Sequence, residues 1–184
     1  MIARNDDRRI RQLIENATQA CARGRVLKAD RLVRQAEAEA PRHPLVLNET
    51  ACRLLIKGDA AGANVLLKQA IIQDPSQATL WLNLAVALRG LNRTVEEMAA
   101  IGQVLALEPR NFRAMLQKAS LHELQGQRRA AAMAYRQALQ SVPAGSIPPQ
   151  SMRPVFEHAL QFVEDFIEGR LQDLRARYAE DRPR

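Results

Sequence analysis

The chain has 184 residues, of which 47% are hydrophobic and 26% are charged, a balance that provides enough apolar surface for a core and excludes wholesale disorder. Its 27 Lys and Arg residues against 20 Asp and Glu residues give a net charge of +7. Aromatic residues and glycines are few, whereas the helix formers Ala, Leu, Gln and Arg are abundant, so a β-sandwich or barrel is excluded and an all-α fold is predicted.

The N-terminal segment is charged and contains no apolar stretch of the kind found in secretory signals. We therefore expect residues 1–9 to form a flexible N-terminus. The two cysteines, Cys21 and Cys52, are too few for a disulfide framework, and no stretch approaches the roughly 18 apolar residues of a membrane span. These features predict a soluble, cytoplasmic protein with reduced thiols and no membrane contact.

A period of 34 residues organises the chain after this segment. The period appears in the prolines, in a column of alanines and in a column of glycine or asparagine: Pro41, Pro75, Pro109 and Pro143; Ala17, Ala51, Ala85 and Ala119; Gly24, Gly58, Asn92 and Gly126. Further small residues follow at Ala29, Ala63 and Ala131, and at Ala36, Ala70 and Ala138. Repeats of this length indicate a solenoid of helical pairs. We predict four helical hairpins over residues 10–145, at 10–43, 44–77, 78–111 and 112–145.

Each column has a physical reason. A small residue in the middle of each helix lets two helices approach closely, and a Gly or Asn between the helices tolerates the left-handed backbone of a helix end. Proline ends the second helix because it has no amide hydrogen to donate. Large residues fill the remaining inward positions, at Leu13, Leu47, Trp81 and Met115 in the first helices and at Val33, Leu67, Ile101 and Tyr135 in the second helices.

This pattern resembles the tetratricopeptide repeat, over about three quarters of the chain. The second and fourth repeats match the family most closely. The third departs from it, with Glu97 and Val104 where the family prefers alanine and Asn92 where it prefers glycine. The resemblance implies an all-α, right-handed helical-hairpin solenoid.

Residues 146–184 are predicted to form a turn-rich linker and a long C-terminal capping helix. Ser151 is a suitable N-cap and Pro154 falls in the first turn, so the helix should run to about residue 178. Its apolar residues recur at spacings of three and four, which predicts one stripe that covers the open face of the last repeat. The far end should project beyond that repeat. Its interface candidates, for self-association or for contact with a downstream domain, are Leu171, Leu174 and Tyr178.

No residues suited to catalysis are recognisable. The three histidines, His43, His122 and His158, have no partners at metal-ligand spacing, and no glycine-rich phosphate loop or nucleophile elbow occurs. We expect no enzyme activity, cofactor or metal site in this chain.

The distribution of charge argues against a nucleic-acid track. The segment charges are +4 for residues 1–43, zero for 44–77 and for 78–111, +4 for 112–145 and −1 for 146–184, so no continuous basic stripe exists. A basic patch at either end is the ordinary solvated surface of a helical protein. Nucleic-acid binding remains the least favoured of the functions considered.

Proteins of the tetratricopeptide family bind extended peptides in a concave groove lined by the first helices. Carried onto this chain, the groove candidates that the resemblance implies are Glu15, Asn48, Glu49, Asn83, Arg89, Arg113 and Gln117. Only Asn83 matches the carboxylate clamp of chaperone-binding members outright, because Asn48, Cys52 and Gln117 replace three clamp residues and Arg113 replaces a lysine. The groove would be acidic near Glu15 and Glu49 and basic near Arg89 and Arg113. We expect a protein-interaction scaffold whose peptide or protein ligand carries an acidic group.

A narrower resemblance concerns the C-terminal segment. Residues 147–159 and 170–177 resemble the segment that joins the repeats to the catalytic domain in bacterial aspartyl/asparaginyl β-hydroxylase-type proteins. Such enzymes use Fe(II) and 2-oxoglutarate in a separate domain that follows the repeats, and nothing after Tyr178 could form that domain. The alternative function is therefore the substrate-positioning repeat region of such a hydroxylase.

Overall fold

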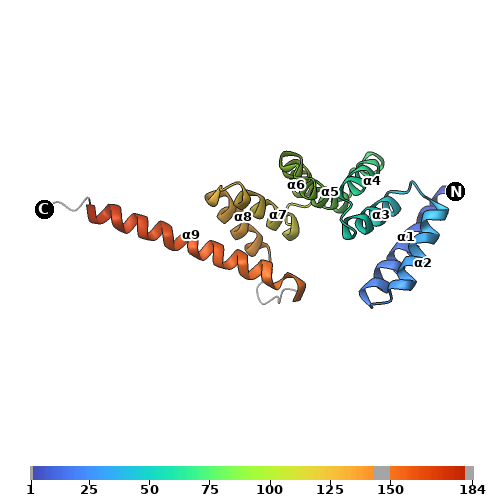
Figure 1. Ribbon diagram of the computed structural model, residues 1–184, viewed down its shortest axis with the longest axis horizontal. Coiled ribbons are helices and arrows are strands. Elements are labelled where there is room, and N and C mark those ends of the chain that lie inside the picture. Colours follow the sequence, from blue (N-terminus) through green and yellow to red (C-terminus); the bar gives the residue numbers. More distant parts are fainter. Residues whose placement is uncertain (1, 143–149, 181–184) are drawn as a thin grey trace. The chain divides into compact units, whose positions relative to one another are not determined.

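The computed structural model describes residues 2–142 and 150–180, although not the side chains of residues 2–6, 151, 174 and 176–180. Over these residues the fold is all-helical, as predicted (Figure 1). The helices are α1 (Ile2–Ala22), α2 (Val26–Glu39), α3 (Pro44–Ile56), α4 (Ala60–Gln73), α5 (Ala78–Gly90), α6 (Thr94–Leu107), α7 (Phe112–Leu124), α8 (Arg128–Ser141), the short 3-10 helix η1 (Gln150–Met152) and α9 (Arg153–Glu180).

The helix starts repeat with the predicted period. The first helices α3, α5 and α7 begin 34 residues apart, and so do the second helices α2, α4, α6 and α8. The chain forms two compact units, Met1–Gln103 and Val104–Arg184. In the first unit α1 pairs with α2, α3 pairs with α4, and α4 also packs on α5; in the second, α7 pairs with α8 and α8 packs on α9.

The small residues lie where the two helices of each hairpin meet. The first-helix alanines are all buried, with exposed fractions of 2% for Ala17 and 0% for Ala51, Ala85 and Ala119. Their second-helix counterparts Ala63 and Ala131 are also fully buried. A methyl group at these positions fills the space between the helices, whereas a longer side chain would force the helices apart.

The turns within the hairpins adopt the left-handed backbone that the glycine column predicted. Gly24, Gly58 and Gly126 have φ of 70°, 84° and 71°, and Asn92 has φ of 57°. Asn92 is the only non-glycine residue with positive φ among the described residues. Asparagine tolerates this conformation better than most residues, so the third repeat keeps the turn geometry of the others.

Six of the eight large side chains that the columns placed in the core are buried, whereas Leu13 and Trp81 are only partly buried. In the second unit, Met115 and Tyr135 pack with the alanines of α7 and α8 and with Ala159 of α9. Trp81 is only half-buried, and its indole Nε1 donates to the carbonyl oxygen of Pro75 at 2.8 Å. That bond ties the start of α5 to the preceding turn.

The N-terminus differs from the expected flexible segment, because α1 begins at Ile2 and residues 2–9 are its first turns. Within these turns, Asp7 contacts the N-cap residue of α3. The Asp7 carboxylate lies 2.9 Å from His43 Nε2 and accepts from Arg11 Nε at 3.0 Å. These hydrogen bonds, led by that with His43, lower the pKa of Asp7. His43 in turn caps α3, since its Nδ1 accepts from the Leu45 amide at 3.2 Å.

The C-terminal helix α9 begins two residues after the predicted N-cap, with Pro154 in its first turn. It passes through Gly169 without a break and continues to Glu180. Its first half covers the last hairpin: Ala159 is fully buried, and Phe162 and Val163 pack against the core of α7 and α8. The capping role predicted from the apolar stripe is therefore present in this half.

The left-handed turn at Asn92 gives a test of the repeat geometry. Asn92→Ala should lower the free energy of unfolding by about 1–2 kcal/mol, because a Cβ without a local hydrogen-bonding group is strained at positive φ. Asn92→Gly should leave stability unchanged or raise it slightly. Urea unfolding of the two variants would measure the difference, and equal stabilities would mean that position 92 is not left-handed.

Candidate functional site

The groove candidates of the first unit lie on its first helices, and two of them are in contact. Asn83 of α5 donates from Nδ2 to Asn48 Oδ1 of α3 at 2.8 Å, and the same Nδ2 lies 3.3 Å from Cys52 Sγ. We call these three residues the Asn83 network. It joins the first helices of two successive repeats through side chains that are only partly buried. The network therefore places amide groups of both helices at one face.

The electrostatics next to this network are acidic. Burial, with a smaller contribution from Glu37, raises the pKa of Glu49, although Arg53 opposes the shift. Burial also raises the pKa of the Cys52 thiol to about 11, with Glu49 adding to it. The thiol is therefore a neutral, weakly polar group rather than a reactive thiolate. Glu15, the remaining candidate of the acidic end, is exposed on α1.

Arg89 has a structural partner that the sequence did not reveal. Its Nε donates to Glu97 Oε1 at 2.7 Å, and its Nη2 lies 2.6 Å from the same oxygen. Glu97 occupies the position where the other repeats have Ala29, Ala63 or Ala131, and only 1% of it is exposed. A buried carboxylate requires such a partner. Arg89 therefore stabilises the third repeat, in addition to being a candidate residue of the groove.

The two candidates of the second unit share the first helix of its hairpin. Arg113 is exposed in the first turn of α7, and Gln117 lies one turn later and is partly buried. Asn111 caps this helix, because its side-chain oxygen accepts from the Ala114 amide at 3.0 Å. The cap fixes the start of α7 and thereby the position from which Arg113 extends.

A cluster of polar side chains in the second unit was not predicted. Tyr135 donates its hydroxyl to Glu123 Oε2 at 2.7 Å, and His158 Nε2 lies 3.0 Å from the same oxygen. The three residues line an open cleft of about 630 Å³ together with Ser120, Leu124, Pro154 and Val155. The repeat columns gave no signal for this cluster, because His158 lies outside the repeats. Its hydrogen bonds connect α7, α8 and α9. The role best supported for this cluster is therefore to hold these three helices together.

The C-terminal interface candidates are described in part. Leu171 is 47% exposed on α9, and the side chains of Leu174 and Tyr178 lie outside those that the structure describes. Among the described residues, no group of three or more His, Cys, Asp or Glu could hold a metal ion. None of the described helices combines the length and the apolar character needed to cross a membrane.

Comparison with known proteins identifies the fold. No family model matches the chain, and neither does any curated protein sequence. Among solved structures, it is similar to an O-GlcNAc transferase variant of Thermobaculum terrenum, with a TM-score of 0.67, 21% identity and coverage of 79% of this chain and 29% of that chain. A chain of the APC/C hetero-tetramer Cut9-Hcn1 gives a TM-score of 0.66 at 20% identity, over 80% of this chain and 29% of that one.

A third similar structure, MamA, gives a TM-score of 0.63 at 18% identity and covers 93% of this chain and 88% of that chain. These are tetratricopeptide-repeat proteins, so the chain has a tetratricopeptide-type fold. It spans under a third of the Cut9-Hcn1 and O-GlcNAc transferase chains. At these identities the likeness concerns the fold alone.

The ion pair of the third repeat predicts a selective loss of stability. Arg89→Ala should lower the free energy of unfolding by about 1–3 kcal/mol, because it leaves the buried Glu97 carboxylate without this donor. The matched control is Arg93→Ala, whose ion pair with Glu96 is exposed and should contribute less than about 1 kcal/mol. Adding Glu97→Ala to Arg89→Ala should recover most of the loss. Urea denaturation would show this, and equal effects of the two arginine variants would contradict it.

The cluster around Glu123 predicts a pH dependence. Burial alone would raise the pKa of Glu123, but the hydrogen bonds from His158 and Tyr135 outweigh it, so the pKa lies below its ordinary value of 4.5. The ionised Glu123 carboxylate therefore contributes its full stabilisation of the folded state above pH 4.5. This stabilisation is lost as the pH falls through the lowered pKa of Glu123. On acidification across this range, the Tm of the wild type should fall more than that of Glu123→Gln. Glu157→Gln, which changes an exposed carboxylate of α9, should follow the wild type.

Proposed function

We propose that the chain is a non-catalytic protein-interaction scaffold that binds an extended peptide or protein segment along the first helices of its repeats. The observation that carries the proposal is the Asn83 network, in which Asn83 and Asn48 of successive first helices meet at 2.8 Å. A side-chain amide offers both donors and an acceptor. Amides arranged on successive helices suit the alternating N–H and C=O groups of an extended peptide backbone.

The proposed ligand carries an acidic group toward the basic candidates. Arg113 of the second unit offers a planar set of donors that can hold a carboxylate through two hydrogen bonds. Arg89 remains a groove candidate, but the Glu97 carboxylate already compensates much of its positive charge. Glu15 and Glu49 suit a basic or neutral segment of the same ligand, because a carboxylate placed there would be repelled.

One similar structure supports a role in assembly. The Cut9-Hcn1 structure is a hetero-tetramer, so a chain with this fold occurs there in a complex of several subunits. This supports a protein ligand for the present chain without naming one.

The hydroxylase alternative rests on the sequence resemblance of the C-terminal segment. Part of that segment, residues 147–149, lies outside the described residues. In this alternative the repeats would position a protein substrate for a domain on a longer chain, and Fe(II) and 2-oxoglutarate would belong to that domain. The cytoplasmic location expected from the sequence suits either function.

Peptide binding can be tested by fluorescence anisotropy with a library of extended peptides, each made with a C-terminal carboxylate and with a C-terminal amide. Asn83→Ala should weaken binding of both forms. Arg113→Ala should weaken the carboxylate form by about tenfold and the amide form much less, because a charge-assisted contact is lost only from the former.

Two exposed residues on second helices provide the controls. Arg129→Ala on α8 removes the same charge as Arg113→Ala, and Gln69→Ala on α4 removes an amide as Asn83→Ala does. Both controls should bind like the wild type. Equal losses for Arg113→Ala and Arg129→Ala would mean that net charge alone attracts the peptide. Stronger, salt-dependent binding to random DNA than to any peptide would favour the nucleic-acid alternative.

A further inference from the structure

The open cleft that Glu123 lines, here called the Glu123 cleft, continues the candidate groove of the second unit. Four residues of α7 recur at spacings of four, three and four: Arg113, Gln117, Ser120 and Leu124. Residues at these spacings lie along one side of a helix. Ser120 and Leu124 line the cleft, and its other wall comes from the first turns of α9, with Pro154, Val155 and His158. The groove face of α7 therefore leads into the cleft.

The Glu123 carboxylate has one oxygen that the helix packing does not use. Tyr135 and His158 both donate to Oε2, at 2.7 Å and 3.0 Å. The Glu123 side chain is 33% exposed, and its pKa lies below the ordinary value of 4.5, so the group is ionised at neutral pH. Oε1 therefore offers a negatively charged acceptor to a ligand in the cleft.

The rest of the cleft is mostly apolar. Leu124 of α7 is 75% exposed and Val155 of α9 is 43% exposed, and Pro154 lies beside Val155. Ser120 adds a hydroxyl group one turn before Glu123 on α7. An alkyl chain that ends in a hydrogen-bond donor would cover the apolar side chains and bring its donor to these oxygens. The cleft thus combines an apolar wall with one anionic acceptor.

We propose that the Glu123 cleft binds a lysine side chain of the bound protein segment, with the ammonium group on Glu123 Oε1 and Ser120 Oγ and the alkyl stem along Leu124 and Val155. This inference rests on the proposed function, because the lysine belongs to that segment. Lysine suits the cleft better than arginine does. A guanidinium group pairs with both oxygens of a carboxylate, whereas Oε2 of Glu123 already accepts two bonds.

The length of α7 relates this lysine to the acidic group of the ligand. Arg113 lies in the first turn and Glu123 in the last, and ten residues of helix span roughly 15 Å. An extended chain rises about 3.3 Å per residue, so about four to five residues cover this distance. A ligand whose carboxylate lies at Arg113 should therefore carry its lysine about four to five residues away.

NMR titration of the full, ¹⁵N-labelled chain tests the cleft without a peptide. The probe is N-acetyl-lysine methylamide, and its control is N-acetyl-norleucine methylamide, which has the same stem without the ammonium group. The lysine probe should shift the amide signals of Ser120, Leu124 and Val155 and should bind about tenfold more tightly than the control. Equal binding of the two probes, or shifts confined to other residues, would overturn the lysine site.

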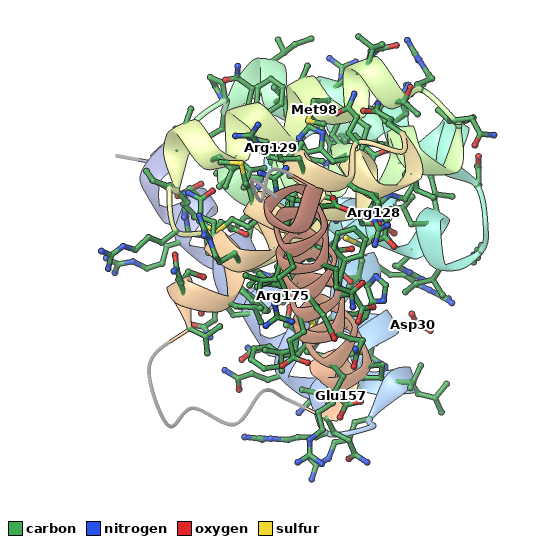
Figure 2. The ribbon with its side chains drawn as sticks, turned by 90° about the vertical axis from the view of Figure 1, so that its left-hand side faces the viewer. Asp30, Met98, Arg128, Arg129, Glu157 and Arg175 are labelled. Atoms are coloured by element: carbon green, nitrogen blue, oxygen red, sulfur yellow. The ribbon has the colours of Figure 1, made fainter. Side chains whose placement is uncertain are left out.

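Glu123→Gln removes the charge while keeping the shape and an acceptor oxygen, so it should abolish the preference for the lysine probe. The matched control Glu157→Gln removes a carboxylate near the start of α9 (Figure 2), at a residue that does not line the cleft. It should keep the tenfold preference. A preference for lysine that survives Glu123→Gln would overturn the proposal.

A second variant leaves the hydrogen bonds of Glu123 in place. Leu124→Arg puts a positive charge at an exposed position of the cleft and should raise the Kd of the lysine probe by about tenfold. Leu27→Arg makes the same change on α2, at a leucine that is 86% exposed, and should leave that Kd unchanged. Equal effects of the two variants would contradict the site. Thermal melting of each variant establishes that the chain remains folded.

Peptides separate this inference from the proposed function. Short Ala/Ser peptides with a C-terminal carboxylate and one lysine would be compared, by fluorescence anisotropy, with the same peptides carrying norleucine. The lysine peptide should bind about tenfold more tightly when the lysine lies about four to five residues from the carboxylate. Peptides that bind equally well with either residue at every position would overturn the lysine site and leave the proposed function standing. Binding of the lysine probe without binding of any peptide would do the reverse.

Discussion

The close approach of two helices in each hairpin is the constraint on which the rest of the structure depends. It requires a methyl group where the helices meet, and Ala51, Ala85 and Ala119 are fully buried at that level. Once this distance is fixed, the length of the connecting turn is fixed as well, and the turn is closed by a residue with positive φ. The large side chains then fill the space that remains, so each repeat is a variation on one geometry.

The third repeat has a charged residue at the position where its two helices meet. Glu97 is buried where the neighbouring repeats have alanine, and Arg89 neutralises it from the end of the preceding helix. A carboxylate at this level is stable only if the arginine is held in place, so residue identity at the two positions is coupled. The third repeat therefore resembles the others in backbone geometry, but an arginine–glutamate ion pair takes the place of an alanine in its interior.

Most of the fold could be predicted from the sequence because the same arrangement of packed residues recurs every 34 residues. The position of Gly58 predicts the conformation of Asn92, and Ala51 predicts the burial of Ala119. Contacts between residues that belong to no column could not be predicted in this way. Asp7 of α1 is hydrogen-bonded to His43 before α3, and His158 reaches Glu123 from a helix outside the repeats. The pairing of Arg89 with Glu97 was equally hidden, although the departure of Glu97 from alanine marked the position.

The placement of aromatic residues has a consequence for following the protein in solution. The single tryptophan, Trp81, lies in the first unit, and its indole is held by the carbonyl oxygen of Pro75. Both tyrosines, Tyr135 and Tyr178, belong to the second unit. Tryptophan fluorescence, excited at wavelengths that tyrosine does not absorb, therefore reports on the first unit alone, whereas far-UV circular dichroism follows the helices of both units. Two optical transitions that coincide would indicate that the units unfold as one cooperative system, and two that separate would give each unit its own unfolding equilibrium.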